Sequence, residues 1–288
     1  MPTLREIRRR ISSVQSTQQI TKAMKMVAAA KLRRAQENIL ATRPYAYKLA
    51  GTIGHLVARL EHSANPLLKI RPVQKVLLVV VTADRGLCGA FNSNIIRYAT
   101  HLINSYTNLE LFLFPVGKKG FDHLAKRSVR IFSHKINFFN HVEFKDAVEI
   151  VDQLVQVYQT DQFDRIEIVY NQFKSAIQQN ITLEQFLPFT PDQELQHTKS
   201  LIDFLYEPGK EEILGVLIPR HLHIQMWKIL LESNAAEQGA RMTAMESATE
   251  NAEDMIGLLS LGYNRARQAT ITKEISEIVG GAEALKER

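Results

Sequence analysis

The residues best placed for chemistry lie at 82–89, where the chain reads Thr-Ala-Asp-Arg-Gly-Leu-Cys-Gly. This segment follows an apolar run at 75–81 and precedes a predicted helix at 92–105, a position where α/β proteins bind ligands. Its two glycines could let a backbone approach a phosphate. However, their spacing matches neither G-x-G-x-x-G nor G-x-x-x-x-G-K-[ST]. We therefore predict a glycine-permitted tight turn between strand and helix rather than a phosphate site.

Other reactive side chains form no catalytic or metal-binding pattern. Cys88 is the single cysteine, so it cannot form an internal disulfide, and without an evident histidine partner it is expected to be a small buried hydrophobe. His221 and His223 are two residues apart, which puts their rings on nearly opposite sides of a helix, whereas zinc sites use i, i+4 pairs. No acid pair has a spacing that suggests general acid–base work. The sequence predicts no catalytic residues, no metal and no cofactor.

The middle of the chain predicts an α/β domain. The run at 75–81 is continuous and rich in β-branched residues, as in a buried strand. Further strands are expected at 111–116, 129–132 and 166–170, with a fifth at 175–186. Helices are expected at 92–105, 121–126 and 142–158. This alternation predicts a mostly parallel, doubly wound sheet in a Rossmann-like central domain at 72–205.

Prolines are rare towards the two ends of the chain. Pro2 and Pro44 enclose a segment without proline or glycine, and no proline follows Pro219. Helices over these segments would be about 60 Å and roughly 100 Å long. Helices of that length cannot bury themselves in a compact domain and usually pair with another long helix. We expect the N-terminal helix within 1–58 and the C-terminal helix within 210–288.

The C-terminal segment carries the spacing of a coiled coil. Eight of its residues step by three and four, which predicts a left-handed supercoil: Met242, Met245, Thr249, Ala252, Ile256, Leu259, Tyr263 and Ala266. A second phase follows at Ile275, Ile278, Ala282 and Leu285. The N-terminal segment shows Leu4, Ile7, Ile11 and Val14, an interruption at Gln18 and Gln19, and then Ile20, Met24 and Val27. Alanine and threonine make the seam thin, as suits a shaft that must fit inside another object.

Charge is unevenly distributed. Residues 1–34 contain nine lysines and arginines against one acid, a net charge of +8 within a chain whose total is +6. Residues 232–263 contain six acids and one base. The two charge patterns favour antiparallel pairing, although each exposed ion pair adds little. The basic arm also fits a nucleic-acid or membrane surface, but no aromatic stacking platform accompanies it, so we expect no nucleic-acid partner.

The composition is that of a globular protein. The chain has 288 residues, 45% of them hydrophobic and 23% charged. Its longest apolar run has six residues, at 76–81, far below the roughly 18 that span a bilayer. The first residues lack the apolar stretch of a signal peptide and carry Glu6, unlike a transit peptide. We expect the chain to act in the compartment where it is made.

Three blocks together resemble the gamma-subunit family of F-type ATP synthases. The N-terminal block is Ile7 to Ile11 with Ile20 to Lys31. The middle block is Asp84 to Gly89. The C-terminal block is Ala240 to Met245, Tyr263 to Ile275 and Glu277 to Ala282. The resemblance covers the whole chain but is weak across 95–200.

This resemblance implies an antiparallel left-handed coiled coil of the terminal helices plus a Rossmann-like domain. It implies a non-catalytic rotor shaft, one copy per complex, inside a ring of alpha and beta subunits and docked on the epsilon subunit and the c ring. It further implies a peripheral protein on the cytoplasmic face of a bacterial plasma membrane. The implied contacts with the alpha/beta ring are Met24, Arg241, Arg267, Gln268 and Thr272, and those with the c ring or epsilon are Tyr206 and Glu207.

Two features depart from the family pattern. The paired-cysteine insertion of chloroplast relatives is absent, so redox regulation is not expected. Gly239 stands where the family usually has a small helix former, and glycine costs a helix interior about 1 kcal/mol relative to alanine.

Two other functions fit parts of the sequence. A nucleotide-binding Rossmann enzyme with helical arms would need a phosphate loop and catalytic groups. A basic coiled-coil protein that binds nucleic acid would need its lysine and arginine side chains on an exposed face. Affinity purification distinguishes all three, because it would recover partner subunits, a nucleotide or nucleic acid.

Overall fold

The structure is a computed structural model that describes residues 3–57, 65–127, 129–176, 178–190, 207 and 209–286. The chain divides into two compact units, which we describe separately. The first combines residues 1–27 with 242–288, and the second is the α/β unit at 28–241.

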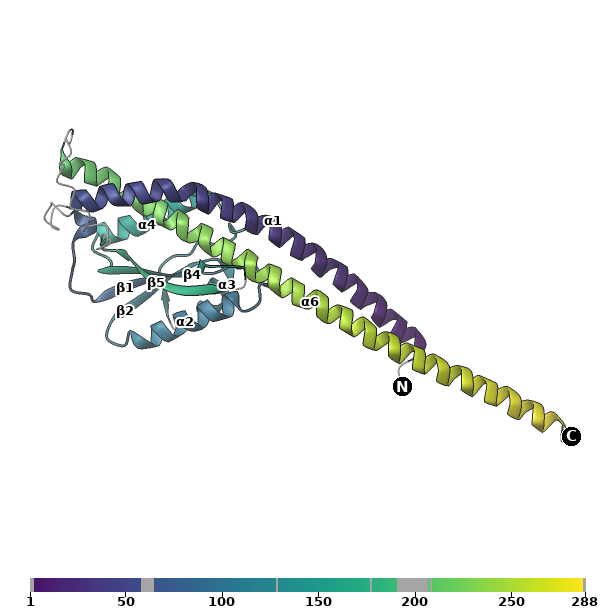
Figure 1. Cartoon of the computed structure of the whole chain (residues 1–288). Helices are drawn as coiled ribbons and strands as arrows, with labels where there is room; N and C mark the ends of the chain where they lie inside the picture. The colour runs from purple at the N-terminus through teal and green to yellow at the C-terminus, as the bar shows by residue number, and fades with distance from the viewer. Residues whose placement is uncertain are drawn as a thin grey trace. The chain divides into compact units, whose positions relative to one another are not determined.

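A five-stranded sheet forms the centre of the α/β unit (Figure 1). The strands are β1 (Lys75–Val81), β2 (Glu110–Val116), β3 (Arg130–Ile131), β4 (Arg165–Phe173) and β5 (Gln179–Leu187), in the order β3-β2-β1-β4-β5. β1 pairs in parallel with β2 and β4, and β3 runs parallel to β2. Of the strands in the described residues, only β5 is antiparallel, to β4. The predicted mostly parallel sheet is confirmed.

Helices cover both faces of this sheet because β1 is apolar on both sides. Leu78 and Val80 face α2 (Phe91–Ser105) and α3 (Lys118–Leu124). Leu77, Val79 and Val81 face the layer made by α4 (Phe144–Gln159) with parts of α1 and α6. All six residues from Val76 to Val81 are fully buried, as expected of a central parallel strand.

Both long helices continue through a proline. α1 spans Leu4–Val57 with Pro44 inside, and α6 spans Lys210–Lys286 with Pro219 inside. An interior proline removes a backbone hydrogen bond and costs about 3 kcal/mol. Packing offsets that cost, since Leu49 and Ile53 are buried after Pro44. α6 begins before Pro219, within the expected range 210–288, and Leu214 and Ile218 in its first turns are buried in the core.

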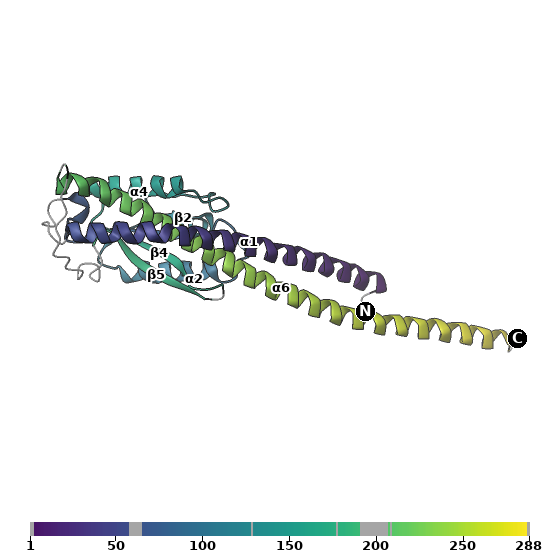
Figure 2. The same ribbon diagram turned by 45° about the horizontal axis from the view of Figure 1, so that its top comes forward.

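In the other unit, the start of α1 lies beside α6 in antiparallel orientation, as two views agree (Figures 1 and 2). Arg8 donates to the Tyr263 hydroxyl at 2.7 Å, and Lys25 pairs with Glu246 at 2.5 Å. The later residue of α1 thus contacts the earlier residue of α6, as in an antiparallel pair. All eight predicted seam residues from Met242 to Ala266 are buried or half-buried. The antiparallel pairing and the α6 seam are confirmed.

The predicted interruption of the α1 seam is wrong. Residues at 4, 7, 11, 14, 18 and 21 are all buried or half-buried, so the three-four spacing continues through Gln18 and Thr21. Ile20 and Val27, which we expected in the seam, are each 57% exposed. The apolar pattern misled because a polar residue, Thr21, occupies a seam position and finds a hydrogen-bonding partner across it.

The second phase of the α6 seam is not formed by the described side chains, which reach residue 282 and so leave out Leu285. Every residue from 267 to 282 is exposed, including Ile275 at 56% and Ile278 at 71%. The reason is the length of α1, which begins at Leu4 and reaches only the level of Tyr263.

Candidate functional site

The loop after β1 lies at the strand ends where an α/β protein would bind a ligand. The strand order reverses direction at β1, since α2 leads to β2 on one side and α4 leads to β4 on the other. Such a switch point usually opens a crevice outside the carboxyl ends of the strands. The contacts of Thr82, Asp84, Asn92 and Cys88 show what fills that space here.

Thr82 ties β1 to the segment after β2. Its backbone N–H donates to the Val116 carbonyl at 2.7 Å, and its hydroxyl oxygen accepts from the Gly120 N–H at 2.8 Å. A Cβ on Gly117 would lie 2.1 Å from the Thr82 carbonyl oxygen, and Gly117 has a φ of 102°. Glycine is therefore required at 117 both by backbone conformation and by close approach.

Asp84 acts as an anchor for backbone rather than for a ligand. One carboxylate oxygen accepts from the N–H groups of Lys118 and Asn137 at 2.8 and 2.9 Å. The other accepts from the Phe139 N–H at 2.9 Å. Sequence reasoning did not find this role, although Asp next to a glycine-rich turn is a typical backbone acceptor.

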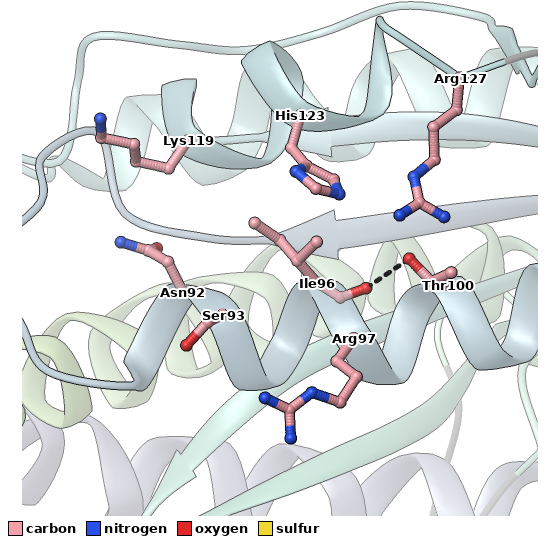
Figure 3. A pocket seen from close by; sticks show the side chains of 8 residues that line it. All are labelled: Asn92, Ser93, Ile96, Arg97, Thr100, Lys119, His123 and Arg127. Carbon is pink, nitrogen blue, oxygen red and sulfur yellow. Dashed lines mark hydrogen bonds between the residues drawn. The ribbon is translucent and has the colours of Figure 1, made fainter.

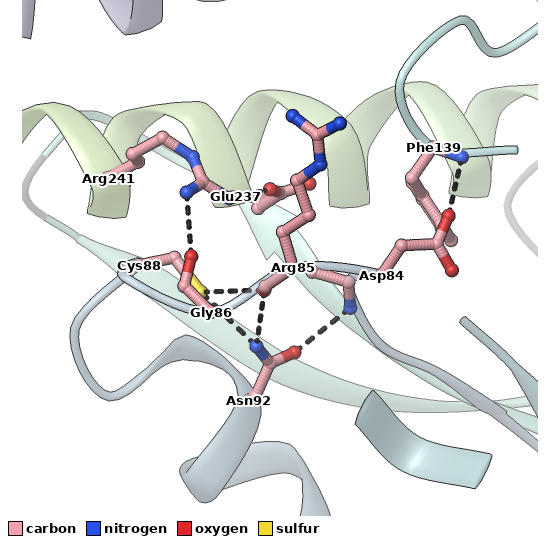
Figure 4. A network of polar contacts seen from close by, with 9 residues as sticks. Asp84, Arg85, Gly86, Cys88, Asn92, Phe139, Glu237 and Arg241 are labelled. Carbon is pink, nitrogen blue, oxygen red and sulfur yellow. Dashed lines mark hydrogen bonds and ion pairs between the residues drawn. The ribbon is translucent and has the colours of Figure 1, made fainter. Parts of the chain in front are cut away.

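Asn92 holds the turn itself in shape (Figure 4). Its side-chain oxygen accepts from the Ala83 N–H at 2.9 Å, and its amide donates to the Arg85 carbonyl and the Cys88 sulfur, both at 3.2 Å. Cys88 is only 2% exposed, which confirms the buried hydrophobe. Burial is the main reason that the pKa of its thiol is raised, so it is a poor nucleophile. Positive φ angles at Leu87 and Gly89 confirm a tight turn.

Helix α6 closes the remaining space. Ala236 is fully buried against Ala83, Cys88 and Phe91, with Ala240 packed beside them. The crevice at the switch point is thus filled by the chain's own helix.

Two charged side chains of α6, Arg241 and Glu237, also hold this helix against the loop after β1 (Figure 4). Arg241 donates to the Gly86 carbonyl at 2.7 Å and forms an ion pair with Glu237 one turn earlier. The two side chains are 11% and 5% exposed. Burial is the largest influence on Glu237 and raises its pKa, opposed by Arg241. The pair fixes α6 to the loop.

The long helices carry exposed apolar side chains in the coiled-coil unit. On α1, Met26 is 63% exposed, beside Ile20 and Val27. On α6, Leu258 is 71% exposed, and the end of the helix adds Ile271, Ile275, Ile278 and Val279. The three-four spacing of Ile271, Ile275 and Ile278 puts them on one face of α6, and exposed apolar surface of this kind marks docking sites on soluble proteins.

The predicted contact residues have different surroundings. Arg267, Gln268 and Thr272 share the exposed end of α6, where the Thr272 hydroxyl donates back to the Gln268 carbonyl at 2.9 Å. Met24 is half-buried on α1.

At the other predicted site, Tyr206 lies outside the described residues, and Glu207 is exposed. Among the described residues, no group of histidine, cysteine and acidic side chains could hold a metal ion. Nor is any described helix long and apolar enough to cross a membrane.

These features define a class of protein: an α/β unit whose ligand crevice is filled by its own helix, joined to a coiled coil that presents apolar docking surface. The family model described as ATP synthase matches residues 3–285. A gamma chain of ATP synthase from Chlorobium phaeobacteroides is 50% identical over 99% of this chain and 100% of its own length. One from Chloroherpeton thalassium is 48% identical over 100% and 99%. The chain belongs to the gamma-chain family of ATP synthase.

Solved structures agree with this membership. A chain in the mitochondrial ATP synthase of Euglena gracilis, in an F1/c-ring assembly, superposes with a TM-score of 0.72 at 25% identity. The match covers 98% of this chain and 94% of that one. A chain from the central stalk and c ring of the Tetrahymena thermophila enzyme gives a TM-score of 0.61 at 29% identity, over 80% and 99%.

Proposed function

We propose that this chain is the rotor shaft in the central stalk of an F-type ATP synthase. It transmits torque between the c ring and the catalytic head of alpha and beta subunits, and so couples proton or sodium flow to ATP synthesis or hydrolysis. It is a structural subunit, not itself catalytic. Full-length identity of about half to ATP synthase gamma chains carries this proposal.

The exposed end of α6 is the part that enters the head. Ile271, Ile275, Ile278 and Val279 are 46–71% exposed in the single chain. Burying such a side chain fully contributes about 1.5–3 kcal/mol. A sleeve of partner subunits would supply that burial while polar neighbours such as Thr272 and Gln268 keep the contact from becoming a permanent core.

Arg267, Gln268 and Thr272 are the proposed contacts with the beta subunits at this end. Arg267 and Gln268 are both exposed, and both carry donors suited to carboxylates or carbonyls of a partner. Met24 offers a flexible apolar contact on α1. Arg241 is already bound to Gly86 and Glu237, so its proposed contribution is to hold the Gly86 loop in position for the head rather than to make a free contact.

The opposite docking partners are the c ring and the epsilon subunit, which we propose meet the segment around Tyr206 and Glu207. One copy is present in each complex. The complex is membrane-bound, and we place this chain on it as a peripheral subunit at the cytoplasmic face of a bacterial plasma membrane.

Reconstitution tests the proposal. The chain is combined with alpha, beta and epsilon subunits and with the membrane sector, and ion-driven ATP synthesis is measured in vesicles. A complex without the chain should synthesise no ATP, and adding it back should restore synthesis. Arg267→Ala together with Gln268→Ala should assemble but lower coupled synthesis several-fold, whereas Lys126→Ala, an exposed position on the α/β unit, should not. Undiminished synthesis in the double variant would rule out the proposed beta-subunit contact.

A further inference from the structure

A cleft between α2 and α3 (Figure 3) lies on the face of the sheet that these two helices cover, opposite the face that packs against α6. It has a cavity volume of about 530 Å³, within the range of small-molecule sites. It lies next to the turn after β1, since Asn92 lines the cleft and also holds that turn.

The charge that lines this cleft is of one sign. Arg97 comes from α2, Lys119 and His123 from α3, and Arg127 from the turn that follows α3. No acidic side chain lines the cleft. Asp122, on α3 between Lys119 and His123, is the nearest acid in sequence and is not part of the lining.

These cations have no counter-ions within the part of the chain that the structure describes. Arg97, Lys119, His123 and Arg127 are exposed and make no ion pair with any described residue. Elsewhere on the same unit, Lys135 and Arg71 are each paired with acids. An unpaired cluster at one hollow concentrates positive potential there.

The walls of the cleft are held in place. Ile96 supplies an apolar floor, and the Thr100 hydroxyl donates to the Ile96 carbonyl at 2.8 Å (Figure 3). Because that hydroxyl hydrogen is used, Thr100 offers a ligand an acceptor, and the cations are left as the donors. His123 and Arg127 extend toward α2 across the cleft (Figure 3). Guanidinium and ammonium groups together are typical phosphate ligands.

We propose that the α2–α3 cleft binds a phosphate-bearing anion of the size of inorganic pyrophosphate or the phosphate chain of a nucleotide. Lys119 and Arg127 neutralise the phosphate charge, and His123 donates one hydrogen bond. Arg97, whose guanidinium points away from α3 in Figure 3, adds only longer-range attraction. The donors are exposed, so binding is modest and weakens steeply with salt. The site is distinct from the helix surfaces that carry torque, and it does not depend on the rotor proposal.

The test uses the full chain in magnesium-free buffer at low salt, titrated with inorganic pyrophosphate in a calorimeter. Wild type should bind with one-to-one stoichiometry, and Lys119→Gln or Arg127→Gln should each weaken binding about fivefold or more. Lys126→Gln removes the same charge from an exposed position outside the cleft and should change binding less than twofold. Equal loss in all three variants, or no binding by wild type, would overturn the proposal.

A second readout locates the anion. The His123 ring signals, assigned by their absence in His123→Gln, should shift on addition of pyrophosphate, and the other eight histidines should not. ADP as a second titrant separates a nucleotide from an inorganic anion: tighter binding than pyrophosphate assigns the nucleotide, and equal or weaker binding assigns the inorganic anion. If an octaglutamate peptide binds and pyrophosphate does not, the cleft recognises an acidic protein segment and the proposal is wrong.

Discussion

Thr21 on α1 and Thr249 on α6 share a hydrogen bond of 2.8 Å between their hydroxyl oxygens, inside a coiled-coil seam. Each hydroxyl also lies within hydrogen-bonding distance of a carbonyl of its own helix, at Gln18 and Met245. Thr21 is only 8% exposed. A polar pair inside a mainly apolar seam favours one register of the two helices.

Changing one threonine of this pair should cost more than changing both. Thr21→Val or Thr249→Val alone leaves a part-buried hydroxyl with a lost partner, an expected loss of about 1 kcal/mol in unfolding free energy. The double variant replaces both by an apolar group of similar shape and should be near wild type. Urea unfolding of the four proteins gives the coupling energy. Additive losses in the double variant would mean that the two hydroxyls do not interact.

Arg241→Ala should destabilise the α/β unit by about 3 kcal/mol, because it leaves Glu237 buried and without its ion-pair partner. Urea unfolding followed by tryptophan fluorescence of Trp227 measures the change. Lys25→Ala is the matched control, since Lys25 and Glu246 are 38% and 45% exposed and their pair should contribute no more than about 1 kcal/mol. Equal effects of the two substitutions would show that the Arg241 pair is not buried in solution.

Gly239→Ala should fail to stabilise α6 despite the better helix former. A Cβ at 239 would lie 3.1 Å from the Ala176 carbonyl oxygen and 3.2 Å from its Cα, so backbone would have to move. At Gly215, in the same helix and unit, nothing lies within 4 Å of the added Cβ, and Gly215→Ala should gain about 1 kcal/mol. Thermal unfolding of both variants checks this, and an equal gain at 239 would disprove the close approach.

Glu232→Gln should stabilise the chain at high pH more than at low pH. Burial is the main cause that raises the pKa of Glu232, and its Oε2 has no hydrogen-bonding partner among the described residues. The folded state thus favours the protonated acid, so the stability that protonation provides is present below the unfolded pKa and lost as pH rises through the folded pKa.

The expected gain in Glu232→Gln is about 1 kcal/mol at pH 8 and smaller at pH 5, measured by urea unfolding at both. Glu253→Gln, at an exposed position on the same helix, is the control and should show no such trend. A gain that does not vary with pH would exclude ionisation of Glu232 as its cause.

Much of the fold could be read from the sequence because its signals are local. The apolar run at 76–81 and the three-four spacing from Met242 to Ala266 each appear as predicted. The seam of α1 could not be read in the same way, because Gln18 and Thr21 are polar and the partner of Thr21, Thr249, lies 228 residues away in the sequence. Both long helices also continue past their prolines because tertiary packing stabilises them there, and local sequence patterns do not show that packing.

The candidate site likewise combines features that local sequence predicts with features that depend on residues far apart in the chain. The glycines of 82–89 predict its turn, and Gly89 does adopt a positive φ, but the other positive φ falls on Leu87 rather than on Gly86. The role of Asp84 depends on Lys118, Asn137 and Phe139, and no spacing rule connects them. From the sequence, Gly239 is expected to lower the stability of the helix. In the structure, its lack of a side chain lets α6 approach the backbone of Ala176.

The closure of the strand-end crevice by α6 has a further consequence. In a ligand-binding protein of this architecture, a ligand binds reversibly in that crevice, and the fraction bound depends on the ligand concentration. Here the occupant is covalently attached, so its local concentration is fixed by the chain and a solute competes for the place at a disadvantage. Ala236, Glu237 and Arg241 thus hold α6 against the loop that follows β1, so a twist applied to this part of α6 would act first on that loop.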